Sequence, residues 1–178
     1  MAKNTYELGL GLTEEHRALA DSVRSFAERT VTPDHVRAAV ESKSEDKFPP
    51  FWAALAGQDL LGLHVPEDKG GHGAGLLTLA VALEALGRTA APGPFVPTAL
   101  SAALVAAADS KVGIELLPGL LDGSRTAAVA LGRPLEASAH DGGYRVTGVA
   151  DAVLGGEHAD TVLLPITVGD GVRWAVVD

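Results

Sequence analysis

The chain has 178 residues, of which 47% are hydrophobic and 21% charged, a balance typical of a globular protein rather than a disordered tail. A chain of this size buries roughly 70% of the surface that its unfolded form exposes, enough for one or two small domains. Its 14 basic and 23 acidic residues give a net charge of −9, which disfavours nucleic acids and anionic membranes as partners.

The sequence contains no cysteine, which excludes disulfides, thiolate catalysis and cysteine-ligated metal sites. Residues 1–7 lack the apolar run of a secretory signal, and the longest strongly apolar stretch, 99–108, is too short to span a bilayer. We therefore expect a cytoplasmic protein.

The first two thirds of the chain favour helices. Thr13 is a suitable N-cap, Glu14 and Glu15 follow it in the first turn, and apolar residues then recur at helical spacing until Pro33 ends the pattern. The other expected elements are a polar loop at 41–48, a short helix after Pro49 and Pro50 that ends at Gly57, an extended apolar segment at 60–66, a buried helix at 76–86, a helix at 98–108, and one at 112–121 that Pro118 and Gly119 interrupt.

The periodicity changes after residue 122. Short β-branched runs separated by Gly, Asp and Pro predict an antiparallel sheet, with strands at 126–131, 144–149, 151–154, 161–166 and 172–177. The predicted fold class is therefore α+β, with an N-terminal all-α domain at 1–121 and a partial antiparallel β-domain at 122–178. The last strand would be an unprotected apolar edge, so we expect the natural polypeptide or a partner chain to continue the fold.

Several common site motifs are absent. Gly9-Leu10-Gly11 and Gly71-His72-Gly73 begin like dinucleotide-binding loops, but neither completes G-x-G-x-x-G. The six histidines show no metal-ligand spacing, so we expect no metal site and read His64 and His72 as loop residues.

Several short motifs occur along the chain in a fixed order that can be compared with known families. They are Leu12–Arg17 at a helix start, a G-x-x-x-P-E-x-x-G-G-x-G loop at Gly62–Gly73, the helix end Glu84–Arg88, an L-P-x-L-x-x-G phrase at Leu117–Gly123, and the strand phrases Tyr144–Gly148 and Ala159–Asp160. Each phrase is weak alone, since Gly and Pro turns recur in many folds. Together, over almost the whole chain, they resemble the acyl-CoA dehydrogenase family.

The resemblance implies Cα–Cβ dehydrogenation of an acyl-CoA thioester, in which FAD accepts a hydride from Cβ while a carboxylate removes the Cα proton. In the family that base lies in a C-terminal helical domain that these residues lack, so no catalytic residue is assigned and we expect the chain alone to be inactive. The phrase around Ala91–Phe95 looks most like actinobacterial members that degrade steroids or bulky acyl groups in lipid metabolism. Some of those are two fused or paired dehydrogenase units.

The first flavin-contacting motif of the family, A-L-T-E-P-x-A-G-S-D, is altered here. Leu131, Pro134 and Ser138 match it, but Gly132 replaces the threonine and Arg133 replaces the glutamate. The flavin would therefore lose a hydroxyl partner, although a backbone N–H could still donate to it.

The second motif, K-x-W-I-[TS]-N-G, falls on residues 150–156. Ala152 stands where the tryptophan would cover the flavin, and Leu154 where a hydroxyl would be. The cofactor-binding candidates that the resemblance gives are Leu131, Gly132, Pro134, Ser138, Ala152 and Leu154, with Ser138 also a candidate for substrate binding.

Two functional hypotheses follow. In the first, the chain is part of an FAD-dependent acyl-CoA dehydrogenase, with backbone donors holding the flavin, aided by a neighbouring subunit. In the alternative, its flavin pocket has decayed, and the chain is a non-catalytic half that scaffolds or completes a catalytic partner. In both cases we expect a homo- or hetero-oligomer with another acyl-CoA dehydrogenase unit.

Overall fold

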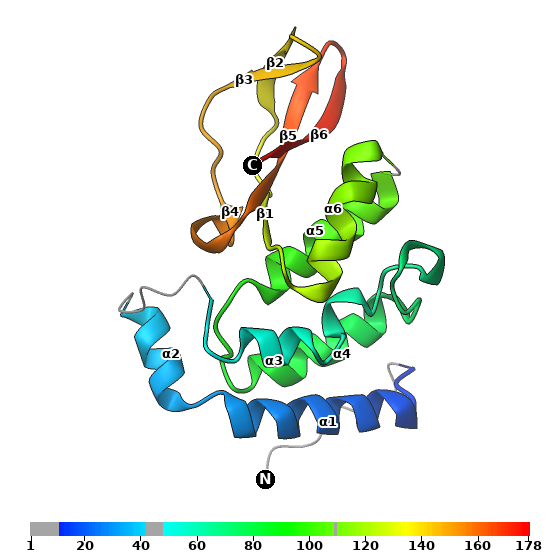
Figure 1. Ribbon diagram of the computed structural model, residues 1–178, viewed down its shortest axis with the longest axis vertical. Helices are drawn as coiled ribbons and strands as arrows, with labels where there is room; N and C mark the ends of the chain where they lie inside the picture. The colour runs from blue at the N-terminus through cyan, green and yellow to red at the C-terminus, as the bar shows by residue number, and fades with distance from the viewer. Residues whose placement is uncertain (1–10, 42–47, 109) are drawn as a thin grey trace.

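The computed structural model describes residues 11–41, 48–108 and 110–178, so the N-terminal segment and most of the predicted polar loop at 41–48 lie outside it. The molecule is elongated, with helices at one end and a curled sheet at the other (Figure 1). The fold class is confirmed as α+β. The helices are α1 (Glu14–Thr30), α2 (Pro33–Val40), α3 (Trp52–Ala56), α4 (Gly75–Gly87), α5 (Phe95–Ala108) and α6 (Lys111–Asp122).

The two N-terminal helices begin in the same way. Thr13, predicted as a cap, accepts a hydrogen bond from the His16 N–H, and His16 Nδ1 accepts one from the Thr13 N–H. Thr32 and His35 repeat this arrangement at the start of α2. Pro33 therefore does more than end the first helical pattern, because it occupies the first turn of α2, where its missing N–H has no cost.

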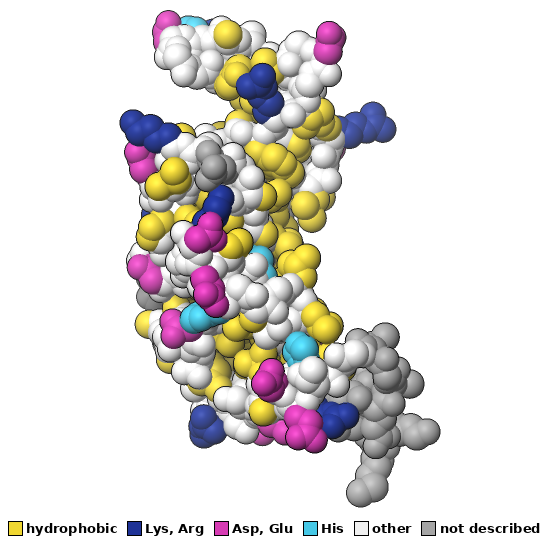
Figure 2. Space-filling model, turned by 90° about the vertical axis from the view of Figure 1, so that its right-hand side faces the viewer, with side chains coloured by type: hydrophobic (Ala, Val, Ile, Leu, Met, Phe, Trp, Pro, Cys, Tyr) yellow, Lys and Arg dark blue, Asp and Glu magenta, His cyan; other side chains and the backbone are white. Residues whose placement is uncertain are grey.

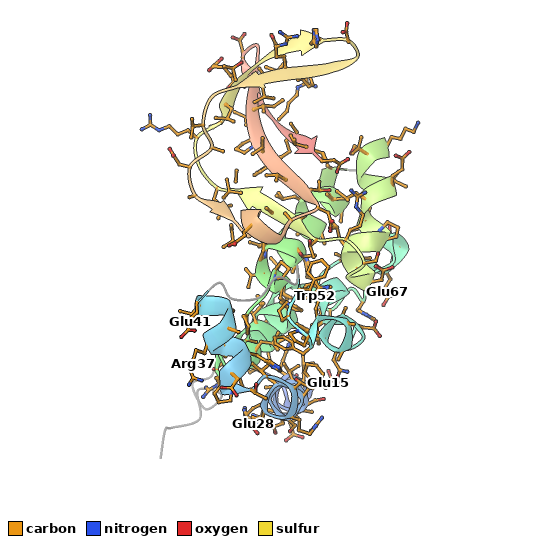
Figure 3. The ribbon with its side chains drawn as sticks, turned by 60° about the vertical axis from the view of Figure 1, so that its left-hand side comes forward. Glu15, Glu28, Arg37, Glu41, Trp52 and Glu67 are labelled. Atoms are coloured by element: carbon orange, nitrogen blue, oxygen red, sulfur yellow. The ribbon has the colours of Figure 1, made fainter. Side chains whose placement is uncertain are left out.

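The helical end of the molecule has one large apolar core. It joins α1, α3 and α4 to the start of α5. Its members include Val23, Phe26, Leu55, Leu61, Leu79 and Leu86. Trp52 is buried in this core, and its indole N–H donates to the Gly123 carbonyl at 2.9 Å. Figure 3 shows Trp52 inside the molecule, between the helices and the sheet.

Three local expectations about the helical end differ from the structure. The segment expected to be extended at 60–66 contains a 3-10 turn, Leu60–Gly62, because it packs against α5 and α6 instead of a strand. The helix expected at 98–108 starts at Phe95. The helix expected at 76–86 is exposed at its start, where Leu76 is 69% accessible.

The last helix is not interrupted at Pro118. Helix α6 runs from Lys111 to Asp122 with the proline inside it. A proline there removes the donor for the Ile114 carbonyl. Because Ile114 lies at the surface, water can donate a hydrogen bond to that carbonyl. The packing of the buried side of α6 stabilises the helix.

The sheet holds the strands β1 (Ala127–Ala130), β2 (Leu135–His140), β3 (Gly143–Thr147), β4 (Val153–Leu154), β5 (Thr161–Val168) and β6 (Gly171–Val177). β2 was not predicted as a strand, because its sequence has no β-branched residue and its strand form comes from pairing with β3 and β5. The sheet is also mixed rather than antiparallel, since β1 and β2 both run parallel to β5.

Strand β5 organises the sheet. Along one edge it pairs first with β1, at Thr161–Leu163, and then with β2, at Ile166 and Thr167. Its other edge pairs with β6 over 162–168. Pro165, which has no N–H to donate, falls in the gap where β1 has ended and β2 has not begun, so the proline costs no ladder hydrogen bond there.

A second apolar core joins the sheet to the helices. Ala127, Val129 and Leu163 pack against α5 and α6, and Thr98 Oγ1 of α5 accepts a hydrogen bond from the Ala127 N–H at 3.4 Å. This core fixes β1 above α5 (Figure 1). Among the described residues, no helix has both the length and the apolarity needed to cross a bilayer.

Candidate functional site

Four of the six candidate cofactor residues lie together at the end of β1. Strands β1 and β4 pair through Val129 with Leu154 and Ala130 with Val153. Beyond this pair, the Leu131 N–H donates to the Ala152 carbonyl at 3.4 Å, and Gly132 follows. Leu131, Ala152 and Leu154 are exposed.

Two segments of the chain, at Gly132 and at Asp151, pass close to each other. A Cβ atom built on Gly132 would lie 2.9 Å from the Asp151 carbonyl oxygen, closer than real Cβ contacts. The neighbouring Ala152 has a positive φ of 52°, a left-handed conformation uncommon for alanine. We call this contact between residues 131–132 and 151–152 the β1–β4 crossing. Its backbone fills the space into which a side chain at position 132 would extend.

The other two candidate residues lie elsewhere. Pro134 is exposed in the link from β1 to β2. Ser138 is exposed on β2, opposite Arg145 in the β2–β3 hairpin. Figure 1 shows this hairpin at the far end of the sheet from β4, so the fold does not gather Ser138 with the crossing.

The residues present do not fit the flavin contacts that the resemblance implies. The crossing offers no side-chain hydroxyl and no aromatic ring, and the Leu131 N–H already donates to Ala152. A threonine at position 132 would need the backbone near Asp151 to move. Within the described chain, the crossing therefore offers backbone groups, but no side-chain hydroxyl or aromatic ring, to an isoalloxazine ring.

The Gly-rich loop has a structural explanation. The N–H groups of Gly71, His72 and Gly73 donate to the Pro66, Gly62 and Val65 carbonyls at 3.0, 3.0 and 2.8 Å, respectively. A Cβ on Gly71 would lie 2.1 Å from the Val65 carbonyl oxygen, so only glycine fits. These glycines let the chain fold back on itself rather than bind a phosphate.

Beside this loop is a groove of 320 Å³ whose lining includes Asp59, Lys69, His72 and Asp122. Lys69 donates to the Ala106 carbonyl at 2.7 Å, and the Asp122 carboxylate accepts from the Ser124 N–H at 2.8 Å. Two of its charged groups thus serve the fold. No group of described His, Asp or Glu residues has metal-binding geometry.

His64 has an imidazole ring in an unusual environment. Both of its ring nitrogens are buried without a hydrogen bond. Burial lowers the pKa of His64 from its usual 6.5, and the nearby Ala99 carbonyl offsets this only in part. Sequence reasoning read His64 as a loop histidine and could not foresee its burial, which comes from contact with α5.

The family profile for the N-terminal domain of acyl-CoA dehydrogenases matches residues 13–124, more than half of the chain. The chain belongs to the acyl-CoA dehydrogenase family. Among curated relatives from Mycobacterium tuberculosis, acyl-CoA dehydrogenase FadE34 is 33% identical over 94% of this chain and 23% of its own length. FadE27 is 32% identical over 93% of this chain and 46% of its own length.

Solved dehydrogenases have the same fold. A variant of the Tcur3481-Tcur3483 steroid dehydrogenase superposes with a TM-score of 0.80 at 34% identity, over 93% of this chain and 48% of that one. The ChsE4-ChsE5 complex of Mycobacterium tuberculosis gives 0.78 at 29% identity, over 93% and 47%. A Mycobacterium smegmatis glutaryl-CoA dehydrogenase with FADH2 gives 0.77 at 20% identity, which shows the fold alone. The chain spans less than half the length of these relatives and structures.

Proposed function

We propose that this chain is a flavin-free half of an acyl-CoA dehydrogenase assembly, and that it completes a second dehydrogenase unit which carries the FAD and the catalytic base. The β1–β4 crossing carries this proposal. Where the family contributes a hydroxyl and an aromatic ring, this chain has Gly132 and Ala152, and the Asp151 carbonyl occupies the space beside Gly132.

The reaction proposed for the assembly is Cα–Cβ dehydrogenation of an acyl-CoA thioester. Family membership supports this reaction class. A steroid or similarly bulky acyl group is proposed because a protein described as a steroid acyl-CoA dehydrogenase shares 34% identity and a TM-score of 0.80 with this chain. The assembly is proposed to work in the cytoplasm, as part of lipid or steroid breakdown.

A two-unit assembly has support of its own. The name Tcur3481-Tcur3483 joins two components, and ChsE4-ChsE5 is described as a complex. We propose by analogy that this chain also works beside a different acyl-CoA dehydrogenase unit.

The test is to purify the tagged chain from its source cells and to measure flavin absorbance, partner identity and acyl-CoA-dependent reduction of an artificial electron acceptor. We expect an acyl-CoA dehydrogenase to copurify, and flavin and turnover to stay with that partner after the two are separated. The separated chain should be colourless and should not quench the fluorescence of added FAD. Stoichiometric flavin on the separated chain would contradict the proposal and support the first hypothesis, in which the chain is itself the flavoprotein portion.

A further inference from the structure

The His64 side chain belongs to the Gly-rich loop, residues 62–74, and lies against helix α5. Its two ring nitrogens are buried without a hydrogen bond, although the Ala99 carbonyl of α5 is close by. Figure 1 shows the loop at the side of the helical end, beside the lower end of α6. A proton on this ring would place a positive charge in a site that solvent does not reach.

The surroundings of His64 offer little to balance such a charge. Helix α5 has no charged side chain along Phe95–Ala108, and no ion pair among the described residues includes His64. The charged and titratable side chains of the loop, of α6 and of the turn before the loop are exposed or serve other contacts; they are Asp59, Glu67, Asp68, Lys69, His72, Lys111, Glu115 and Asp122. Burial accordingly holds the pKa of His64 below its usual 6.5.

Side chains tie the loop to the rest of the molecule. Leu63 packs against the first apolar core, Val65 lies in the second, and the Lys69 ammonium group donates to the Ala106 carbonyl near the end of α5 at 2.7 Å. The N–H groups of residues 70–74 instead donate to carbonyls of residues 62–67, within the loop itself. The loop can therefore move away from α5 and keep its own hydrogen bonds.

The loop also forms one wall of the 320 Å³ groove. Gly62, Gly70 and His72 line the groove on the loop side, and Pro118 and Leu121 of α6 line it on the other side. The side of the molecule that carries the loop faces the viewer in Figure 2, where histidine and acidic side chains are visible between the sheet and the far helical end. A movement of the loop would change the width of this groove.

We propose that the Gly-rich loop is a pH-sensitive latch, which is closed on α5 while His64 is neutral and opens, widening the groove, when His64 takes up a proton. Opening brings the charged ring into water. Histidine is the residue type whose protonation ordinarily falls near neutral pH, so His64 is the tie that responds to mild acid. The latch is a property of this chain and does not depend on the function proposed for the assembly.

The proposal fixes how opening depends on pH. The open loop binds the proton more readily than the closed loop, because burial lowers the pKa of His64 only in the closed form. The equilibrium constant for opening should therefore rise by about tenfold per pH unit as the pH falls below about 6.5, until the lowered pKa of the closed form is reached.

The experiment measures hydrogen exchange of the loop amides by mass spectrometry between about pH 7 and pH 5, with correction for the intrinsic exchange rate. The sample is the purified chain with any copurified partner bound. His64→Gln removes the titratable group, and His64→Phe is a second variant in case the first does not fold. His72→Gln is the matched control, because His72 is an exposed histidine of the same loop.

We expect the protection of residues 70–74 to fall by about tenfold per pH unit below about pH 6.5 in the wild type and in His72→Gln. It should change little with pH in His64→Gln and His64→Phe. Exchange of these amides should also depend less steeply on urea than exchange of the Val129 amide in β1, because opening the loop exposes less surface than global unfolding.

Three results would overturn the latch. The first is protection that does not vary with pH in the wild type, or that varies equally in the His64 variants. The second is a urea dependence as steep as at Val129, which would mean that protonation acts through global unfolding. The third is loss of the pH response in His72→Gln, which would assign the response to the exposed histidine.

Discussion

His16 connects two helices through the two sides of its ring. Its Nδ1 accepts from the Thr13 N–H at 3.1 Å, so in the neutral ring Nε2 carries the hydrogen and donates to Thr78 Oγ1 of α4 at 3.2 Å. The Thr78 hydroxyl in turn donates to the Ala74 carbonyl at 2.7 Å. A capping residue thus also fixes how α1 lies on α4.

We predict that His16→Ala lowers the free energy of unfolding by about 1 kcal/mol, because the cap loses an acceptor and α4 loses a contact. His16→Gln should lose less, since its amide oxygen can still accept from Thr13. Urea unfolding measures both. Thr78→Val is the control that leaves the cap intact, and an unchanged free energy of unfolding in that variant would contradict the role of the Thr78 contact.

His64 predicts a pH dependence. Its pKa is lowered in the folded chain by burial, so the unfolded chain binds more protons once the pH falls below about 6.5. The free energy of unfolding should therefore fall as the pH drops from that value towards the lower folded pKa. Replacing His64 with Phe should make the loss between about pH 7 and pH 5 smaller than in the wild type. Parallel pH curves for the two proteins would show that His64 does not contribute.

At the scale of elements, the β1–β4 crossing needs glycine. Gly132→Ala places a Cβ 2.9 Å from the Asp151 carbonyl oxygen, and both groups belong to backbone that cannot simply rotate away. We predict a loss of about 1–3 kcal/mol in the free energy of unfolding. Gly87→Ala is the control, because a Cβ at the end of α4 meets nothing within 4 Å and alanine favours helix. An equal free energy of unfolding for Gly132→Ala and the wild type would show that the two segments of the crossing lie further apart in solution.

At the scale of the whole molecule, Trp52 joins the helical end to the sheet. Its indole N–H reaches Gly123 in the link between α6 and β1, and a Cβ on Gly123 would lie 2.6 Å from Ala56 Cβ. The link is thus packed against α3 and leaves little room for the two ends to move separately.

Trp52→Phe should lower the free energy of unfolding by about 1–3 kcal/mol, because the buried Gly123 carbonyl loses its donor. Trp174→Phe, on the exposed edge, should change it by less than about 0.5 kcal/mol. Thermal or urea unfolding followed by circular dichroism compares the two. A similar effect of both substitutions would mean that the Trp52 hydrogen bond adds little to the connection.

Features that depend on near neighbours in the chain could be predicted from local sequence. Thr13 caps α1 because its side chain reaches an N–H only three residues away, and Gly57 follows α3 as expected. The order of helices before strands, and the family resemblance, also follow from local patterns. Conformational preferences over one or two turns suffice for such features.

Features in which distant segments compete for the same space depend on packing and could not be predicted in this way. Leu135–His140 becomes a strand because β3 and β5 offer it hydrogen bonds, and 60–62 forms a turn because α5 and α6 leave no strand beside it. In the candidate site, the sequence showed that Gly132 lacks a hydroxyl, but only the fold placed the Asp151 carbonyl against it. Those two positions are nineteen apart in the sequence, and packing rather than local preference brings them together.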